Sequence, residues 1–234
     1  MALVLGLPSK GRLQADTIDW FARCGITISH ANSTREYRAE VSGLPGLETV
    51  MLPAGEMPRE LAAGRIHLGV TGEDMIRERI ADSETRTRSL AKLGFGDADL
   101  VIAVPDFWID VETMADLDAV AEDFRTRHGM ALRVATKYHN LTRAFFKRHG
   151  IADYRLVDSQ GATEAGPVNG TCEVISDITS SGATLRANHL RILDDGLILR
   201  STANLWQSLD ADLGDAAQAI FDQFVEKISR EPVG

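Results

Sequence analysis

The chain has few cysteines, no long apolar run and no excess of basic residues, and each shortage excludes a class of protein. Its only cysteines are Cys24 and Cys172, which favours free thiols in a reducing compartment over a disulfide-bonded secreted domain. No Cys/His cluster has the spacing of a zinc site. A formal net charge of −9 argues against nucleic acid as the partner.

Membrane and secretion signals are also missing. No apolar run is long enough to cross a bilayer. The apolar segment of residues 1–8 is too short for the core of a signal peptide, and no basic region precedes it. We therefore expect a cytoplasmic protein that binds neither a membrane nor nucleic acid. No nucleophile elbow or Ser-His-Asp set is evident, so the expected chemistry depends on positioning and charge.

What the chain does contain is alternating short strands and amphipathic helices. Hydrophobic residues make up 44% of it, enough for a core. The pattern pauses near residues 94–96 and a second set of strands and helices follows, without a flexible linker. Short strand-to-helix connections predict an α/β fold with mainly parallel sheets. Two such sets predict two lobes with a central cleft, in which ligands meet the carboxyl ends of strands.

The most informative stretch is residues 177–185, Asp-Ile-Thr-Ser-Ser-Gly-Ala-Thr-Leu. A strand enters it and a helix is expected to begin near Ala183, so backbone N–H groups and hydroxyls can converge on an anion. Asp177 precedes this loop, and Glu164 precedes the strand; both can bind sugar hydroxyls. The combination suits a phosphorylated ribose. The alternatives are a Ser/Gly loop that only caps its helix and two ordinary surface acids.

Basic residues follow the first strand. Lys10 and Arg12 flank Gly11, which can let a ligand approach the backbone. Both cations can bind phosphate, although the segment lacks the spacing of a P-loop. A solvated basic helix start is the alternative, but a cation at a helix N-terminus is unfavourable without an anion. Arg35 and Arg38 flank a tyrosine at a strand start, so one of them can face a cleft; an exposed edge is equally consistent.

A further strand-to-helix turn, residues 70–74, contains Gly72, Glu73 and Asp74. Its acids can cap their own helix, which is the favoured interpretation, or contact a ribose or adenine.

Taken together, several ordered motifs resemble the short form of ATP phosphoribosyltransferase. The resemblance extends from about residue 2 to about residue 209. The matching stretches are residues 8–13 (Pro-Ser-Lys-Gly-Arg-Leu), 68–74 (Leu-Gly-Val-Thr-Gly-Glu-Asp), 93–96 (Leu-Gly-Phe-Gly), 99–105, 135–142 and, most specific, 177–188.

This resemblance implies a two-lobed fold of the type II periplasmic-binding-protein kind. Lobe I, on the nucleotide and pyrophosphate side, is expected from residues 1–98 and 186–234, and lobe II from residues 99–185. The resemblance places the catalytic charges at Lys10, Arg12 and Arg35, and ATP contacts at Gly11, Gly72 and Asp74. Residues expected to bind phosphoribosyl pyrophosphate are Glu164, Asp177, Thr179, Ser180, Ser181, Gly182, Ala183, Thr184 and Leu185.

The implied reaction is the first step of histidine biosynthesis. N1 of ATP attacks C1 of phosphoribosyl pyrophosphate, pyrophosphate leaves, and the product is N1-(5-phosphoribosyl)-ATP. Mg²⁺ would be bound through the substrate phosphates rather than by protein side chains. Short forms assemble with a regulatory subunit that resembles histidyl-tRNA synthetase, so we expect a homodimer within a hetero-oligomer.

The chain departs from the family pattern in two places. Many members carry an arginine three residues before Asp-Ile-Pro, where this chain has Pro53 at the start of Pro-Ala-Gly-Glu-Met-Pro; Arg59 or a partner would have to compensate. His139 replaces a common proline, which affects only a local turn. The alternative functions are a non-catalytic two-lobed protein that binds small anions, and a phosphoribosyltransferase with another acceptor.

Overall fold

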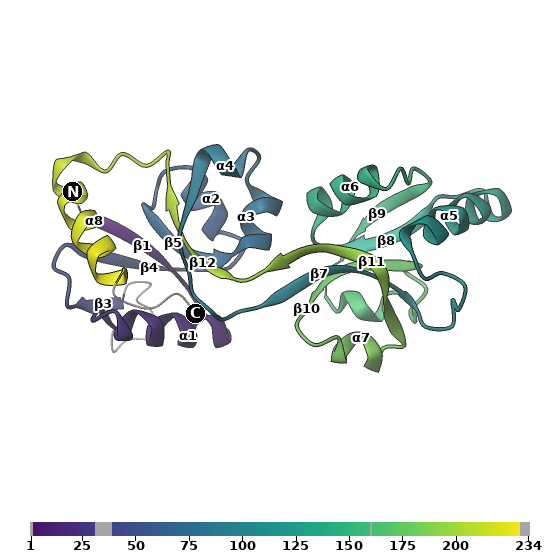
Figure 1. The fold of residues 1–234 in the computed structure, drawn as a ribbon, viewed down its shortest axis with the longest axis horizontal. Helices are drawn as coiled ribbons and strands as arrows, with labels where there is room; N and C mark the ends of the chain where they lie inside the picture. Colours follow the sequence, from purple (N-terminus) through teal and green to yellow (C-terminus); the bar gives the residue numbers. More distant parts are fainter. Residues whose placement is uncertain (1, 31–38, 160, 230–234) are drawn as a thin grey trace. The chain divides into compact units, whose positions relative to one another are not determined.

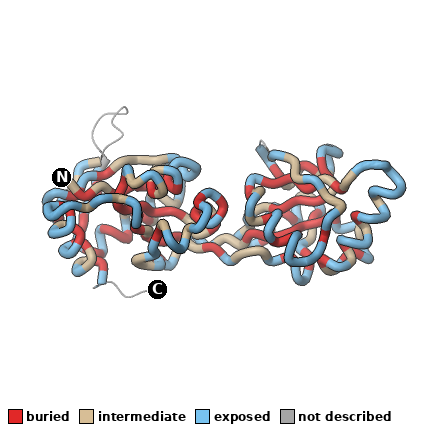
Figure 2. The backbone as a smooth tube through the Cα atoms, turned by 90° about the horizontal axis from the view of Figure 1, so that it is seen from above, coloured by how far each residue is buried: buried red, intermediate tan, exposed pale blue. Residues whose placement is uncertain are grey.

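The computed structural model describes residues 2–30, 39–159 and 161–229. The chain divides into two compact units (Figure 1), unit 1 from Met1–Gly96 and Thr202–Gly234 and unit 2 from Asp97–Ser201. Figure 2 shows buried segments running through the middle of each unit, so each has its own core. Within the described residues, no helix combines the length and the apolar character that a bilayer crossing requires.

Unit 1 is built on a five-stranded mixed sheet with the order β4-β1-β5-β12-β6. β1 runs parallel to β4 and β5, whereas β12 is antiparallel to β5 and β6. A separate antiparallel pair is formed by β2 and β3. The elements are β1 (Leu3–Pro8), α1 (Gly11–Arg23), β2 (Thr27–His30), β3 (Ala39–Ser42), β4 (Leu47–Leu52), α2 (Met57–Ala62), β5 (Leu68–Gly72), α3 (Glu73–Arg79), α4 (Ser83–Arg86), β6 (Thr87–Lys92), β12 (Ala203–Ser208) and α8 (Gly214–Ile228).

Helices cover both faces of this sheet because side chains alternate along β1. Leu5 lies in a cluster with Phe21 of α1 and Phe224 of α8. On the other face, α2 lies so close to the strands that a Cβ on Gly6 would come within 2.5 Å of the Met57 Sδ. Glycine in β1 therefore permits the close packing of α2 on the sheet.

Unit 2 contains a second five-stranded mixed sheet, with the order β11-β7-β10-β8-β9. β8 is parallel to β9 and β10, whereas β7 is antiparallel to β10 and β11. α5 and α6 pack on one face, and the other face packs on Leu185 of α7. The elements are β7 (Ala98–Pro105), α5 (Met114–His128), β8 (Leu132–Thr136), α6 (His139–Arg148), β9 (Tyr154–Asp158), the 3₁₀ helix η1 (Thr163–Ala165), β10 (Val174–Thr179), α7 (Ala183–Ala187) and β11 (Leu190–Ser201).

The expectation of mainly parallel sheets is wrong. Each five-stranded sheet has two parallel and two antiparallel pairings. In these two sheets, every antiparallel pairing involves β7 or β12, the strands that follow the two passages of the chain between units. Such strands are not joined to their neighbours by a strand–helix–strand connection, so the rule that makes those neighbours parallel does not apply to them.

The second passage between units also lies later than expected. It falls between Ser201 and Thr202, not at residue 186, while the first falls between residues 96 and 97, within two residues of the expected place. The reason is β11, which pairs with β7 along unit 2 before the chain leaves. The register of β11 against β7 shifts between Ile192 and Leu197, so β11 is irregular in its middle. The cleft expected between the lobes stays a prediction.

Candidate functional site

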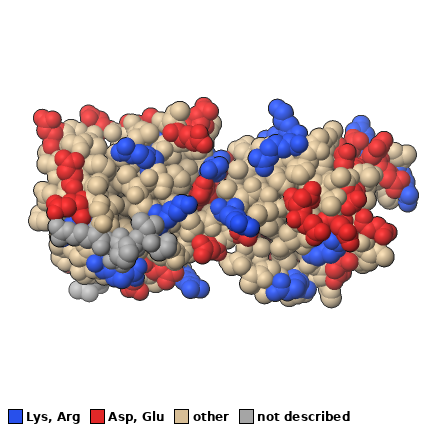
Figure 3. All heavy atoms as spheres, viewed as in Figure 1, with Lys and Arg blue, Asp and Glu red and all other residues tan. Residues whose placement is uncertain are grey.

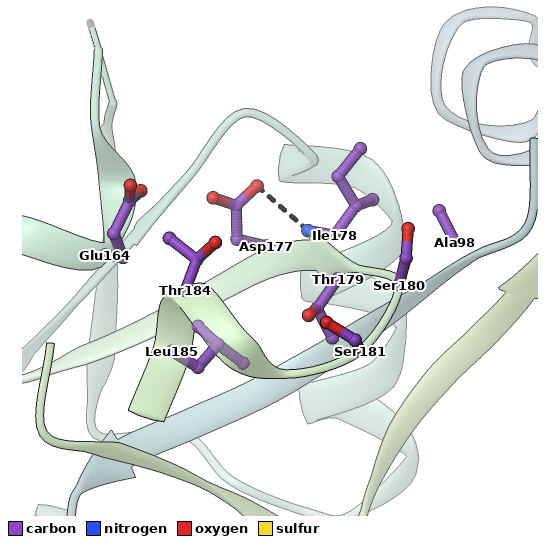
Figure 4. Close-up of a pocket in the computed structure, with 9 residues that line it drawn as sticks. All are labelled: Ala98, Glu164, Asp177, Ile178, Thr179, Ser180, Ser181, Thr184 and Leu185. Carbon is purple, nitrogen blue, oxygen red and sulfur yellow. Dashed lines mark hydrogen bonds between the residues drawn. The ribbon is translucent and has the colours of Figure 1, made fainter. Parts of the chain in front are cut away.

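A pocket of about 360 Å³ lies in unit 2 where β10 ends (Figure 4). It combines the acid at the end of β10, the hydroxyl-rich turn that follows, the start of α7 and an acid from η1. The lining residues are Ala98, Glu164, Asp177, Ile178, Thr179, Ser180, Ser181, Thr184 and Leu185. Seven of these were predicted from the sequence, so segments separated along the chain converge as expected.

The turn between β10 and α7 is held in shape by its own hydroxyls. The Thr179 Oγ1 accepts a hydrogen bond from the Gly182 N–H at 2.8 Å, and the Ser181 Oγ accepts one from the Ala183 N–H at 3.3 Å. Gly182 has φ of +68°, a left-handed conformation that favours glycine. Gly182 and Ala183 are not among the pocket-lining residues, but they form the turn that links Ser181 with Thr184.

The same turn provides donors for an anion. A hydroxyl that accepts a bond still has its own proton to donate, which applies to Thr179 and Ser181. Helix geometry leaves the N–H groups of Thr184 and Leu185 without acceptors inside α7. Because α7 has only five residues, its dipole is small, and these individual donors matter more than the helix as a whole.

Two further contacts fasten the turn to unit 2. The Ser180 Oγ donates to the Asp97 carbonyl oxygen at 2.9 Å. Leu185 is buried in a cluster with Cys172 on the sheet. Both residues were predicted as phosphate-loop residues and both line the pocket, and the structure shows that they also anchor the turn.

Two carboxylates face the other side of the pocket. In Figure 4 the Asp177 carboxylate lies between Glu164 and the hydroxyls of the turn. Burial raises the pKa of Asp177, and the charge of Glu164 adds to that rise. The Ile178 N–H, which donates to the Asp177 Oδ1 at 2.9 Å, opposes it, as does the charge of Lys137. A half-buried carboxylate with one oxygen already held is suited to accept hydrogen bonds from sugar hydroxyls.

The sequence interpretation missed some contributors to this site. Ala98 and Ile178 line the pocket, and neither has a polar side chain that would draw attention. Lys137 follows β8, which is parallel to β10, so the carboxyl ends of the two strands lie at one edge of the sheet. The position of Lys137 directly after a strand of the same sheet was the sequence signal that could have identified it as a neighbour of Asp177. The sequence likewise does not reveal that η1, which carries Glu164, packs against β10.

A second pocket of about 320 Å³ lies in the same unit. It is bordered by the ends of β8 and β9 and by the segment that follows β9. Its lining residues are Ala135, Val157, Asp158, Ser159, Gly161, Ala162, Thr163, Gly166, Asn169 and Thr171. Thr163 lines this pocket and the next residue, Glu164, lines the first, so η1 borders both pockets.

The basic residues predicted after β1 lie in unit 1. Lys10 is exposed at the start of α1, and Arg12, with a side chain 92% exposed, pairs with Asp16 at 3.4 Å. Gly11 has φ of +78° and open space where a Cβ would be. The turn itself thus favours glycine, which is a reason other than the ligand approach that the sequence suggested. Arg35 and its neighbours lie outside the described residues, so its role stays a prediction.

The residues predicted to contact ATP at the end of β5 are also in unit 1. Gly72 ends β5 and precedes α3, while Asp74 in the first turn of α3 is only 6% exposed. Glu73 pairs with Arg77 one turn later, at 2.6 Å. The Glu73–Arg77 pair favours an acid that stabilises its own helix, whereas no side chain among the described residues caps the N-terminus of α3. The ATP contacts of Gly72 and Asp74 stay predictions.

Charge is mixed over the surface. Figure 3 shows acidic and basic side chains interspersed on the face it presents, and the formal net charge is −9. An anionic substrate would therefore be held by local donors rather than by a broadly basic surface.

Comparison of the sequence with known families gives a consistent result. The family model HisG, described as ATP phosphoribosyltransferase, matches residues 53–230. A Cereibacter sphaeroides protein named ATP phosphoribosyltransferase is 58% identical over 217 residues, which cover 93% of this chain and 92% of the relative. A Bradyrhizobium diazoefficiens protein of the same name is 56% identical over 92% of this chain. The chain spans 66% of the length of that longer relative.

Solved structures resemble the fold. The ATP phosphoribosyl transferase (HisG:HisZ) complex from Thermotoga maritima matches with a TM-score of 0.71 at 23% identity, covering 97% of each chain. A histidine kinase sensor domain similar to periplasmic binding proteins matches with a TM-score of 0.53 at 12% identity, covering 98% of this chain and 89% of that one. These likenesses confirm the expected two-lobed α/β architecture and, at such identities, nothing more specific.

Proposed function

The chain belongs to the ATP phosphoribosyltransferase family HisG, whose reaction is the first step of histidine biosynthesis, and we propose how its residues serve that reaction. The observation that carries the proposal is the pocket at the end of β10, where a donor-rich turn faces two carboxylates. Phosphoribosyl pyrophosphate needs both parts, since it presents a phosphate next to ribose hydroxyls. The periplasmic-binding-protein likeness concerns the fold and does not favour a non-catalytic binding protein.

We assign the 5-phosphate of phosphoribosyl pyrophosphate to the turn of residues 179–185. Support comes from the hydroxyls of Thr179 and Ser181, which accept bonds from the turn and retain protons to donate. The N–H groups of Thr184 and Leu185 add donors without acceptors in the helix. Donors fixed before the substrate arrives lose little freedom on binding, so they stabilise an anion more than mobile side chains would.

Asp177 and Glu164 are assigned to the ribose. Both line the pocket opposite the turn, and ionised carboxylates accept hydrogen bonds from hydroxyl groups. Their negative charge also favours the positive charge that develops on the ribose as pyrophosphate leaves. Burial and, to a smaller extent, the charge of Glu164 raise the pKa of Asp177. A donor or cation that approaches this carboxylate therefore stabilises its ionised form.

The reaction is the attack of N1 of ATP on C1 of the ribose. Alignment of two reactants supplies about 7–11 kcal/mol, and a well-placed electrostatic donor about 2.7–4 kcal/mol. Lys10, Arg12 and Arg35 are proposed to face the pyrophosphate or the ATP phosphates, and Gly11, Gly72 and Asp74 the nucleotide. The exposure of Lys10 and Arg12 leaves these side chains accessible to a ligand.

Mg²⁺ is proposed as the cofactor, held chiefly by phosphate oxygens of the substrates. Across the described ranges, no group of three or more His, Cys, Asp or Glu side chains could hold a metal ion. The proposal rests on the chemistry of the ion, since Mg²⁺ usually keeps several waters and binds through substrate phosphates together with one or two carboxylates. Bound in that way, Mg²⁺ would neutralise charge on the leaving pyrophosphate.

We further propose that this is a short-form enzyme controlled by a regulatory subunit resembling histidyl-tRNA synthetase, as a homodimer within a hetero-oligomer. The support is the structural neighbour, which is a HisG:HisZ complex. Size measurement of the purified chain with and without such a subunit tests the assembly. A cytoplasmic location fits a biosynthetic enzyme that consumes ATP and phosphoribosyl pyrophosphate.

The experiment that tests the function follows product formation by near-UV absorbance. The mixture contains the purified chain, ATP, phosphoribosyl pyrophosphate, Mg²⁺ and pyrophosphatase, with and without the synthetase-like subunit. We expect an absorbance rise that requires both substrates. The matched control is Glu164→Gln, which keeps the shape but removes one charge and should raise the KM for phosphoribosyl pyrophosphate. Absence of product in both mixtures would contradict the proposal.

A further inference from the structure

The first passage of the chain between the units falls between Gly96 and Asp97. Just before it, the Phe95 carbonyl oxygen accepts hydrogen bonds from the Ala203 N–H and from the Thr202 hydroxyl, each at 3.0 Å, which fixes Phe95 in unit 1. Gly96 then has φ of +71°, a conformation that favours glycine. Rotation about the backbone of Gly96 leaves both of these bonds intact, so Gly96 is suited to be a hinge residue.

The return passage, between Ser201 and Thr202, changes units at the same point. Thr202 is bonded to Phe95 in unit 1, whereas Ser201 pairs with Ala98 in the β11–β7 ladder of unit 2. The bonds on either side of Gly96 therefore belong to different units, and the hinge is confined to a short segment of each passage.

Immediately after the hinge glycine, the chain is held by the turn of residues 179–185. The Ser180 Oγ donates to the Asp97 carbonyl oxygen at 2.9 Å. Two residues further along, Asp99 pairs with Thr179 in the antiparallel ladder of β7 and β10. The Ser180 bond thus adds one side-chain contact beyond the end of that ladder, and it joins the turn to the residue that follows the hinge.

The use of its proton distinguishes Ser180 from its neighbours. A serine hydroxyl has one proton to donate, and that of Ser180 goes to Asp97. The hydroxyls of Thr179 and Ser181 instead accept bonds from backbone N–H groups and retain their protons. Ser180 therefore lines the pocket without a proton to offer to a phosphate, although it belongs to the turn that is proposed to hold one.

We propose that Ser180 is a positioning residue that couples the bound 5-phosphate of phosphoribosyl pyrophosphate to the hinge at Gly96. This inference rests on the proposed function of the turn. A phosphate that orders the turn also fixes Ser180, which holds the Asp97 carbonyl oxygen. Bound substrate therefore restricts movement about Gly96, and by reciprocity the conformation at Gly96 affects the affinity for the phosphate.

Distances between the two units measure this coupling. Spin labels on Glu84→Cys, in α4 of unit 1, and Asp118→Cys, in α5 of unit 2, occupy exposed positions, and both native cysteines are buried. Pulsed electron paramagnetic resonance gives the distribution of label-to-label distances with and without ligand. The ligand is ribose 5-phosphate, which lacks the pyrophosphate and so cannot join the units through the basic residues proposed to bind that group.

The test variant Ser180→Ala removes the hydroxyl, and Ser180→Thr restores it. Ser181→Ala is the matched control, because the Ser181 hydroxyl is bonded to the Ala183 N–H in the same turn. We expect saturating ribose 5-phosphate to narrow the distance distribution in the wild type, in Ser180→Thr and in Ser181→Ala. In Ser180→Ala the distribution should stay as broad as without ligand, while calorimetry shows binding only about twofold to tenfold weaker than in the wild type.

A double-mutant cycle provides a second measurement. Gly96 is not among the residues that line the pocket, and a Cβ there would lie 3.2 Å from the Ala203 Cβ at a φ that strains a side chain. Gly96→Ala thus alters the hinge and not the pocket. We expect Gly96→Ala to change the affinity for ribose 5-phosphate at least about fivefold when Ser180 is present, and to leave it unchanged in the Ser180→Ala background.

Equal narrowing of the distance distribution in the wild type and in Ser180→Ala would overturn the inference, and so would additive effects in the cycle. A wild-type distribution that does not narrow when ribose 5-phosphate binds would also overturn it, although the proposed function would stand. Failure of the wild-type protein to bind either ribose 5-phosphate or phosphoribosyl pyrophosphate would instead overturn the proposed function, and with it the coupling.

Discussion

Gly182 allows the charge preference of the turn to be measured directly. Gly182→Asp places a carboxylate in the proposed phosphate loop, while Gly182→Asn places a neutral group of the same shape there. Both variants bear the cost of a φ of +68°, about 1–2 kcal/mol for an ordinary residue and less for Asn or Asp. In both, the new Cβ would lie 2.8 Å from the Arg186 Nη1, a flexible side-chain end that can move away.

The difference between the two variants isolates the electrostatic effect. Two unit charges about 4 Å apart interact by about 1 kcal/mol in bulk water and about 4 kcal/mol near a protein surface. A factor of ten corresponds to about 1.4 kcal/mol, so the expected loss of affinity lies between about fivefold and about a thousandfold. Ser181 and Ala183 are exposed and the Arg186 guanidinium can neutralise the added charge. We therefore expect a value toward the lower end.

Isothermal titration calorimetry with phosphoribosyl pyrophosphate at two salt concentrations measures this difference. The gap between Gly182→Asp and Gly182→Asn should narrow at high salt, because salt screens exposed charges. Thermal unfolding should show both variants folded, with similar midpoints. Equal affinities for the two variants at low salt would refute the assignment of the turn to the 5-phosphate.

Three further predictions concern acid, core and basic residues. Burial raises the pKa of Asp177, so its contribution to stability is present at low pH and is lost as pH rises through the raised pKa. Asp177→Asn should therefore raise Tm at pH 7, and this gain in Tm should shrink toward about pH 4. Equal gains in Tm at both pH values would contradict the prediction. Gly6→Val should lower the unfolding free energy by about 1–3 kcal/mol, since its Cβ would meet the Met57 Sδ at 2.5 Å. Gly55→Ala is the control in urea denaturation, because a Cβ at Gly55 would enter open space. Similar unfolding free energies for the two variants would count against the close packing at Gly6. Arg35→Ala should lower kcat/KM with little change in Tm, and unchanged kinetics would exclude a catalytic role.

Local structure and the chemistry of the turn were predictable because they depend on neighbouring residues. The order Asp177, hydroxyl residues, Gly182 and helix start is contiguous, and the glycine conformation and the capping hydroxyls follow from residue type alone. The start of α7 at Ala183 could be predicted for the same reason, since the glycine and the hydroxyl residues before a helix are a local signal. The family resemblance also came from contiguous motifs.

Pairings between distant segments could not be predicted in this way. Periodicity does not show which strand will pair with a strand that follows a passage between units. The antiparallel pairings of β7 and β12, and the inclusion of the whole of β11 in unit 2, were therefore not predicted. Likewise, residue type alone does not show whether Asp74 is exposed, and only packing showed that it is buried.

The sequence by itself determined the family, the α/β class and the loop that is proposed to hold phosphate, because each depends on residues close together in the chain. Only the tertiary structure decided that η1 packs against β10, which brings Glu164 and Asp177 into one pocket. The position of η1 beside β10 depends on the strand order of the sheet, and that order is set by the burial of both sheet faces rather than by neighbouring residues. Burial also sets the pKa of Asp177, since the cost of removing a charge from water depends on everything packed around it.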